Sequence, residues 1–316
     1  MKTSTSKRLR WNVAIWLAAG LFMTGASGMA SGPIMSDPKA EARHQPQVEE
    51  TANGIPLVNI TAPSSGGVSR NEYETFNVPD KGAILNNSYT LSQTELAGYV
   101  QGNNNMAERP AKIIVNEVTG AGSTSMDGFL EVAGNRADVV IANPNGITVN
   151  GGGFINTGKA FLTTGKPVYD GEDHLQRFDI TGGDILIEGK GLGGKETESL
   201  AILSRAVKIN AGIWAKDLHI TTGANTVDAK TLEASAIEGK GGRPAFALDT
   251  AAIGGMYAGR ITLVGTEKGL GVNNSGTWSA EDNLTLDWNG DLKNSGTIYS
   301  KGNTDLRASR LENDKT

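Results

Sequence analysis

The stretch from Val139 to Pro167, VVIANPNGITVNGGGFINTGKAFLTTGKP, decides how the chain folds. Its apolar run, Val139–Ala142, stops at Asn143-Pro144-Asn145-Gly146. Proline sets φ at the second position of a turn, and Asn-Gly accepts positive φ. These residues therefore predict a strand that ends in a tight turn.

The residues after this turn continue the pattern. Ile147 and Val149 alternate with polar neighbours, which is the period of a strand. Gly151–Gly153 interrupt the strand, and Phe154–Thr157 begin another short segment that ends at Thr164-Gly165. The stretch is typical of a protein built from short β segments and turns.

Composition supports a turn-rich β protein. The 316 residues include 42 glycines and 10 prolines but only 6% aromatic residues. Glycine lacks the three-residue period of collagen, and alternating apolar segments favour a repetitive β architecture over disorder. Cysteine is absent, so the fold must hold without disulfides.

The N-terminus has the features of a secretory signal. Four basic residues precede an apolar run, Val13–Met23, and small residues follow at Ala26–Ala30. The run is shorter than the roughly 20 apolar residues of a membrane span. Residues 1–30 are therefore predicted to be a signal peptide. Their removal, with four positive and no negative charges, changes the net charge from −5 to −9. Such acidity disfavours nucleic acid as a partner.

Residues 31–50 are polar and contain three prolines, so we expect a solvated leader that contributes no core residue. Residues 91–109 are expected to leave the regular coils. Apolar segments predicted to be strands occur at 55–60, 73–78, 83–85, 113–115, 139–141, 185–187, 207–209, 218–220, 261–264 and 284–286, with a further apolar position at Leu306.

The clearest repeat has an offset of 20 residues. Val272-Asn273-Asn274-Ser275-Gly276-Thr277 matches Leu292-Lys293-Asn294-Ser295-Gly296-Thr297, and Ile209–Trp214 is a weaker earlier copy. Short strands and Asn-Gly turns at this period predict a parallel β-helix, about seven coils long after Gly171. Asn274 and Asn294 should then form an amide ladder between coils.

Several motifs together resemble the N-terminal secretion domain of filamentous haemagglutinin-like and contact-dependent inhibition toxin-type exoproteins, the passengers of two-partner secretion (TPS). These motifs are NPNGI at 143–147, GFINT at 153–157, FNVPDKGAILNNS at 76–88, INAGIWAKDL at 209–218 and GGMYAGRITLVGTEKGLGV at 254–272. The resemblance implies an all-β fold: a right-handed parallel β-helix, a pectin-lyase-like solenoid, with an N-terminal cap and small extra-helical β elements. It also suggests a TPS (haemagglutination activity) domain at 51–172, followed by a β-helix with haemagglutinin-type repeats at 173–316.

The resemblance further implies export through the periplasm of a Gram-negative-type envelope to the outer cell surface. The expected partner is an outer-membrane transporter whose periplasmic receptor domains bind the chain, commonly by strand addition. Motif matching assigns recognition to twelve residues: Asn86, Asn87, Ser88, Asn143, Pro144, Asn145, Gly146, Gly153, Phe154, Ile155, Asn156 and Thr157. The resemblance assigns contact with a host or neighbouring cell surface to a region beyond Thr316. No end cap is recognisable at Leu311–Thr316. The natural product is expected to be longer, unless the reading frame is truncated.

Two functions of a complete exoprotein stay open on these residues, an adhesin and the stem of a contact-dependent growth inhibition toxin. An enzyme is the rival class, because polysaccharide lyases also use parallel β-helices. A lyase needs clustered carboxylates and a nearby base, whereas Asp179, Asp184, Asp217 and Asp228 occur singly. Gly189–Gly194 satisfies G-x-G-x-x-G but without a βαβ unit. We therefore expect no catalytic residue, metal or cofactor.

Overall fold

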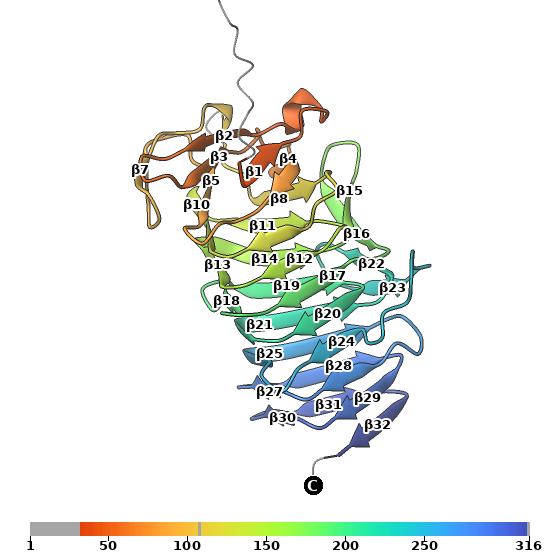
Figure 1. The fold of residues 1–316 in the computed structure, drawn as a ribbon. Helices are drawn as coiled ribbons and strands as arrows, with labels where there is room; N and C mark the ends of the chain where they lie inside the picture. Colours follow the sequence, from red (N-terminus) through yellow and green to blue (C-terminus); the bar gives the residue numbers. More distant parts are fainter. Residues whose placement is uncertain (1–31, 107–108, 315–316) are drawn as a thin grey trace, which may run out of the picture. The chain divides into compact units, whose positions relative to one another are not determined.

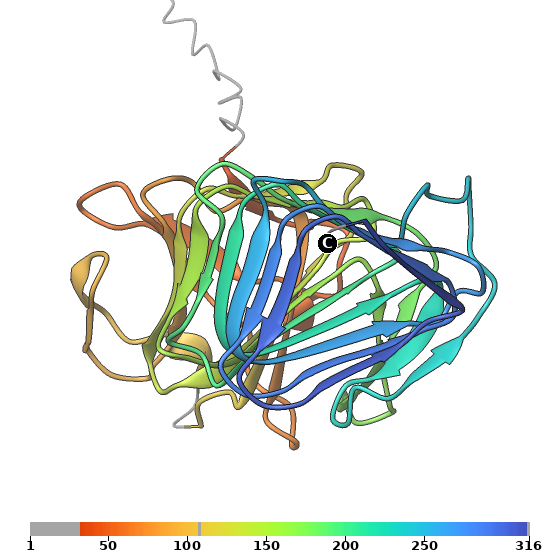
Figure 2. The same cartoon turned by 90° about the horizontal axis from the view of Figure 1, so that it is seen from below.

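The computed structural model describes residues 32–106 and 109–314. The predicted signal peptide lies outside these residues. Residues Gly32–Thr316 form one compact unit. Short strands stack coil upon coil along this unit (Figure 1), and the end-on view shows the coils running around a common interior (Figure 2). Almost all neighbouring coils pair in parallel, which identifies the unit as a parallel β-helix.

Each complete coil contributes strands to three faces. The first face holds β3 (Pro56–Asn59), β5 (Ala83–Asn87), β10 (Phe129–Gly134), β13 (Gly152–Ile155), β18 (Leu192–Gly194), the first halves of β21 (Gly212–Thr222) and β25 (Gly255–Gly265), β27 (Thr277–Ala280) and β30 (Thr297–Ser300). The second holds β4 (Val68–Phe76), β8 (Ile113–Val118), β11 (Ala137–Ala142), β14 (Thr157–Thr163), β19 (Ser199–Ser204), the second halves of β21 and β25, β28 (Leu284–Trp288) and β31 (Thr304–Arg307). The third holds β9 (Thr124–Met126), β12 (Ile147–Val149), β17 (Asp184–Ile187), β20 (Ala206–Ile209), β24 (Leu248–Thr250), β26 (Val272–Asn274), β29 (Asp291–Asn294) and β32 (Arg310–Asn313).

The interior is filled by columns of aliphatic side chains in register. Val207 pairs with Leu248, Leu248 with Val272 and Val272 with Leu292, and all four are completely buried. Because side chains alternate across a strand, each coil can send one set inward while its polar set faces solvent. The core is therefore one continuous apolar column in which each coil packs on its neighbours.

The 20-residue repeat and its amide ladder are confirmed. Asn274 lies opposite Asn294 in the β26–β29 register and donates from Nδ2 to Asn294 Oδ1 at 2.8 Å. Asn294 in turn donates to Asn313 Oδ1 at 2.8 Å. On another corner, Asn303 N donates to Asn283 Oδ1 at 2.8 Å, again 20 residues away. Identical amides thus bridge successive turns of the coil.

The expectation of about seven coils after Gly171 is wrong. Six strands of the third face follow that residue within the described part of the chain. Val207 pairs with Leu248, 41 residues later, because the intervening chain leaves the helix.

The weaker copy of the repeat, Ile209–Trp214, is displaced in register. Trp214 lies opposite Tyr257, which lies opposite Ser279 and not Trp278. A one-residue slip moves a side chain to the other face, so Trp278 is buried while Trp214 is partly exposed.

Extra-helical elements cover outward apolar side chains, as expected. An antiparallel sheet of β15 (Lys166–Tyr169), β16 (Leu175–Ile180), β22 (Asn225–Asp228) and β23 (Ala234–Ala236) packs on the second face, where Val140 and Phe161 meet Phe178. A hairpin of β6 (Ser92–Thr94) and β7 (Gly98–Val100), followed by the 3-10 helix η2 (Asn104–Met106), leaves the first face. Val100 of this hairpin packs with Ile84 and Ala133.

Residues 34–50 form an N-terminal cap, and the expectation that residues 31–50 contribute nothing to the core is wrong. β1 (Ile34–Ser36) pairs antiparallel with β4, and β2 (Gln47–Glu50) pairs antiparallel with β3. The 3-10 helix η1 (Ala42–His44) joins them. Ile34 enters the core and Val48 packs against it. The cap satisfies the backbone edges of the first coil, which would otherwise pair with other chains.

Candidate recognition surface

The organising turn is confirmed, and Asn143 is its centre. The residue is completely buried between β11 and β12. Its Oδ1 accepts the Asn145 N–H at 2.9 Å, and its carbonyl accepts the Gly146 N–H at 3.1 Å. Its Nδ2 donates to Gly122 O at 2.9 Å and Thr124 Oγ1 at 3.0 Å. One side chain therefore closes its own turn and ties it to the previous coil.

The remaining turn residues divide into exposed and buried. Pro144 and Asn145 face solvent. Asn145 Nδ2 donates to Gly120 O at 2.8 Å, on the same earlier loop that Asn143 contacts. Gly146 is buried with φ of 110°, and an added Cβ would lie 3.0 Å from Asp184 O. Only glycine enters this region of φ without cost.

The second group of predicted residues, Asn86, Asn87 and Ser88, is buried at the end of β5. Asn86 Nδ2 donates to Asn59 Oδ1 at 2.8 Å and to Gln101 O at 2.9 Å. Asn87 exchanges hydrogen bonds with the Ala111 backbone, at 2.9 Å from Nδ2 and 2.7 Å to Oδ1. These amides hold both ends of the hairpin excursion against the coil.

The third group, Gly153–Thr157, forms β13 and the corner that follows it. The expectation that Gly151–Gly153 all lie outside a strand is wrong, because β13 begins at Gly152 and the left-handed residue is Gly151, with φ of 101°. Phe154 points into the core, and an added Cβ on Gly153 would meet the Phe129 ring. Asn156 is exposed at φ 52° and donates to Val132 O at 2.8 Å and Gly134 O at 3.0 Å.

The structure brings two of the three groups together. β10 pairs with β5 on one side, where Gly134 meets Asn87, and with β13 on the other, where Glu131 meets Ile155. The Asn156 side chain donates to the backbone carbonyls of Val132 and Gly134 at the end of β10. The 143–146 turn lies on a different corner, between the second and third faces. The predicted residues therefore make two separate surfaces.

A groove of about 890 Å³ lies at the paired groups, between the hairpin strand β6 and the ends of β10 and β13. Its lining includes Glu95, Glu131, Ile155 and Asn156. Hydrogen-bonding groups rather than deep apolar pockets thus dominate it. Leu91, which lines the groove, is exposed, and so are Tyr89 and Tyr99 of the hairpin region and Phe129 at the start of β10.

Sequence reasoning missed two residues that shape this surface. Glu131 is only 3% exposed and accepts the Glu95 and Leu96 N–H groups at 2.7 and 2.9 Å, which fixes the hairpin tip. Burial raises the pKa of the Glu131 carboxyl, while those two N–H groups lower it. Asn103 is buried and donates to Ile60 O and Asn86 O. A lone carboxylate in the apolar run FLEV was the available signal for Glu131.

The residues considered for other chemistry are dispersed. Asp179 pairs with Arg177, Asp217 pairs with Arg260, and Asp228 accepts N–H groups of its own turn. No group of three His, Cys, Asp or Glu residues in the described chain could hold a metal ion. Gly189–Gly194 runs from a turn into β18 between parallel strands. No helix among the described residues is long and apolar enough to cross a membrane.

Comparison with known proteins decides the family. The family of TPS secretion domains matches residues 34–298, which covers most of the chain, including the cap, both motif surfaces and the extra-helical sheet. This chain is a TPS secretion domain. The crystal structure of the filamentous hemagglutinin secretion domain has the same fold, with a TM-score of 0.75 and 31% identity, over 89% of this chain and 97% of that one.

Longer relatives carry the same TPS domain. Toxin CdiA of Yersinia pestis is 43% identical over 298 residues, 87% of this chain and 9% of that protein. The 16S rRNA endonuclease CdiA of Enterobacter cloacae is 46% identical over 260 residues, 82% of this chain and 8% of that protein. The chain thus spans less than a tenth of the length of these relatives. Their names describe the whole proteins rather than the stretch shared with this TPS domain.

Proposed function

We propose that this chain is the N-terminal secretion module of a large exported surface protein, recognised in the periplasm by the soluble receptor domains of an outer-membrane TPS transporter. Membership of the TPS family carries the proposal. The mature protein would pass through the periplasm to the outer cell surface. Catalysis has no part in this role, which is one of transport. The boundary at residues 172 and 173 between the recognition domain and the repeats belongs to the same proposal.

The twelve motif residues serve this function by shaping the surface. The buried amides among them already hydrogen-bond inside the fold. Asn143 donates to the 120–124 loop, and Asn87 donates to the carbonyl of Ala111. Recognition therefore falls to the exposed members, above all Asn145 and Asn156, and to the backbone that the buried members hold in place. Such a rigid polar surface suits an extended partner that pairs through its main chain.

Two exposed asparagines test recognition with little damage to the fold. Asn145→Ala removes hydrogen bonds with a net value of about 0.5–1.5 kcal/mol. Asn156→Gly removes the amide and also relieves the left-handed φ of 52°. Asn289→Ala is the matched control, since exposed Asn289 also bonds a backbone carbonyl, Thr266 O, away from both surfaces.

The measurement is the amount exported with the cognate transporter, together with the denaturant midpoint of the purified domain. We expect export of the Asn145 and Asn156 variants to fall while all three midpoints stay near the wild-type value. Export that falls only in proportion to the midpoint would assign the motifs a structural role. Unchanged export would remove these residues from recognition.

A second candidate is the stem of a contact-dependent growth inhibition toxin. The names of the relatives at 43–46% identity favour it over an adhesin, because both are called CdiA and one is called an endonuclease. In this alternative any toxic activity lies outside the shared stretch. Reading the DNA that follows this coding region distinguishes the two: a toxin stem predicts a nuclease or other toxin segment and an immunity gene, and an adhesin predicts further repeats.

A further inference from the structure

The N-terminal cap is attached to the β-helix by few apolar contacts. Its buried apolar side chains are Ile34 and Pro46, with Met35 and Val48 half-buried. Three of the four residues of β2, Gln47, Glu49 and Glu50, are exposed. Since apolar burial is the dominant stabilising contribution in folding, a segment that buries so little is among the first to open.

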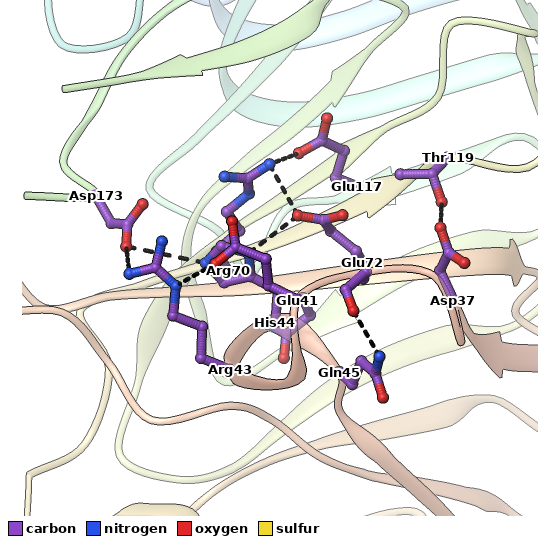
Figure 3. A network of polar contacts seen from close by, with 12 residues as sticks. Asp37, Glu41, Arg43, His44, Gln45, Arg70, Glu72, Glu117, Thr119 and Asp173 are labelled. Carbon is purple, nitrogen blue, oxygen red and sulfur yellow. Dashed lines mark hydrogen bonds and ion pairs between the residues drawn. The ribbon is translucent and has the colours of Figure 1, made fainter. Parts of the chain in front are cut away.

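Polar contacts from distant segments hold the cap instead (Figure 3). His44, which is buried, lies 3.1 Å from Glu72 Oε1 through Nδ1 and 3.9 Å from Asp173 Oδ2 through Nε2. Arg43 reaches the same Asp173 carboxylate at 3.3 Å. The Thr119 hydroxyl donates to Asp37 Oδ2 at 2.6 Å. These contacts anchor the cap at two points, Asp37 after β1 and the η1 turn.

The packing beneath η1 is incomplete. A pocket of about 400 Å³, partly open to solvent, lies between this turn and the coil, with Arg43, His44, Arg70 and Asp173 in its lining. Close by, Arg70 Nε and the Tyr169 hydroxyl are buried without a hydrogen-bond partner, while Glu117 Oε2 is held by an ion pair of 3.4 Å with Arg70 Nη2. Unsatisfied buried polar atoms cost free energy, and a pocket at this position leaves η1 without dispersion contacts on that side.

The cap covers two strand edges that can accept another strand. β1 occupies the free side of β4, with Ile34 opposite Phe76, and β2 occupies the free side of β3, with Val48 opposite Val58. The seated cap shows what fits there: an antiparallel extended segment with one apolar side chain directed inward. An uncovered edge of this kind is a ready template for strand addition.

We propose that the cap is a displaceable strap, and that the edges of β3 and β4 beneath it form a docking surface for an extended strand of the transporter's receptor domains. This inference rests on the proposed function. The cap and the incoming strand compete for the same backbone groups, so the fraction of open cap sets the apparent affinity. The anchor at Asp173, about 130 residues after the cap in the chain, makes closure depend on the presence of the extra-helical sheet.

A disulfide across β1 and β4 tests the competition directly. The chain has no cysteine, and Met35 lies opposite Thr75 in the antiparallel pair, both half-buried. The double variant Met35→Cys with Thr75→Cys locks the cap when oxidised and frees it when reduced. Affinity for the purified receptor domains is measured for both states of the same mature protein. We expect oxidised protein to bind at least about tenfold more weakly than reduced protein.

A release variant tests the opposite direction. Asp173→Asn removes the charge that faces Arg43 and His44, and asparagine accepts the φ of 57° found there. Glu172→Gln is the control, because exposed Glu172 belongs to the same turn but contacts no residue of the cap. We expect Asp173→Asn to bind about threefold to tenfold more tightly and to exchange the β1 and β2 amides faster, and Glu172→Gln to match wild type.

Equal binding by oxidised and reduced protein would overturn the strap while leaving recognition by the transporter intact. Absence of binding by every form would instead count against the proposed function. Native-state hydrogen exchange tests, independently of the transporter, whether the cap opens by itself. The β1 and β2 amides should exchange well before those of β3 and β5. If they exchange only through global unfolding, the cap is not displaceable.

Discussion

At the scale of single residues, backbone conformation explains the glycine of the organising turn. Gly146→Val should destabilise the protein by about 1–2 kcal/mol or more, because φ of 110° is forbidden to a β-branched residue and Asp184 O lies in the way. The denaturant midpoint of the purified domain measures this loss. Gly242→Val is the control, since Gly242 has open space around it and no positive φ. Equal midpoints for the two variants would contradict the explanation.

A second residue-scale feature is the ion pair that fastens the long 229–247 excursion. Arg205 is 6% exposed and binds both oxygens of Glu267 at 3.0 Å, while its third nitrogen donates to Lys240 O at 2.7 Å. The Arg205 hydrogen bond is the main cause that lowers the pKa of Glu267, with help from the Ala224 N–H. Breaking such a pair from one side leaves a carboxylate uncompensated.

Arg205→Gln should therefore cost about 3 kcal/mol at neutral pH. A carboxyl whose pKa is lowered by folding stabilises the native state above its unfolded pKa, here near 4.5, and this contribution is lost as the pH falls through the folded pKa. The difference in urea midpoint between wild type and variant should then shrink below pH 4.5. Arg260→Gln, at the exposed pair with Asp217, should change little. A difference in urea midpoint between wild type and Arg205→Gln that stays constant with pH would refute this account of Arg205.

At the scale of elements, the asparagine ladder explains how the last coils keep register. Asn294→Ala would leave Asn274 Nδ2 and Asn313 Oδ1 without the amide between them. We expect a loss of about 1–3 kcal/mol, because Asn274 Nδ2 is buried and would keep only the longer contact of 3.4 Å with Thr297 O, whereas Asn313 is exposed to solvent. Lys293→Ala, one residue away on the exposed side of β29, is the control. Thermal unfolding of both variants measures the effect, and similar melting temperatures would count against the ladder.

At the scale of the whole folded unit, contacts run almost entirely between neighbouring coils, so local stability should follow local burial. Nearly every residue of β19 is buried, whereas β30, β31 and β32 contain no fully buried residue. Amides of these last three strands should exchange with solvent much faster than those of β19. Mass-spectrometric hydrogen exchange measures this gradient. Uniform protection along the chain would mean that the coils unfold as one cooperative block.

The tight turns and the 20-residue spacing of the last coils came from sequence alone because they depend on local chemistry. Asn143-Pro144-Asn145-Gly146 predicts its turn through backbone preferences, and the Asn274 and Asn294 repeat predicts the ladder through its period. The apolar runs in most coils likewise name the inward positions, since a strand has only two faces. The candidate recognition residues came from the motif resemblance, which does not give their burial.

Only the tertiary structure decided what depends on partners far away in the chain. The sequence of residues 34–50 resembles a solvated segment. In the fold it is held by backbone pairing with strand edges and by the ion pair with Asp173, and neither contact requires a periodic apolar pattern in the sequence. Trp214 and Trp278 resemble each other in sequence, yet a one-residue difference in register sends them to opposite faces. Glu131 acts on a hairpin 35 residues earlier. Such long-range pairing is set by three-dimensional packing, which neighbouring residues do not encode.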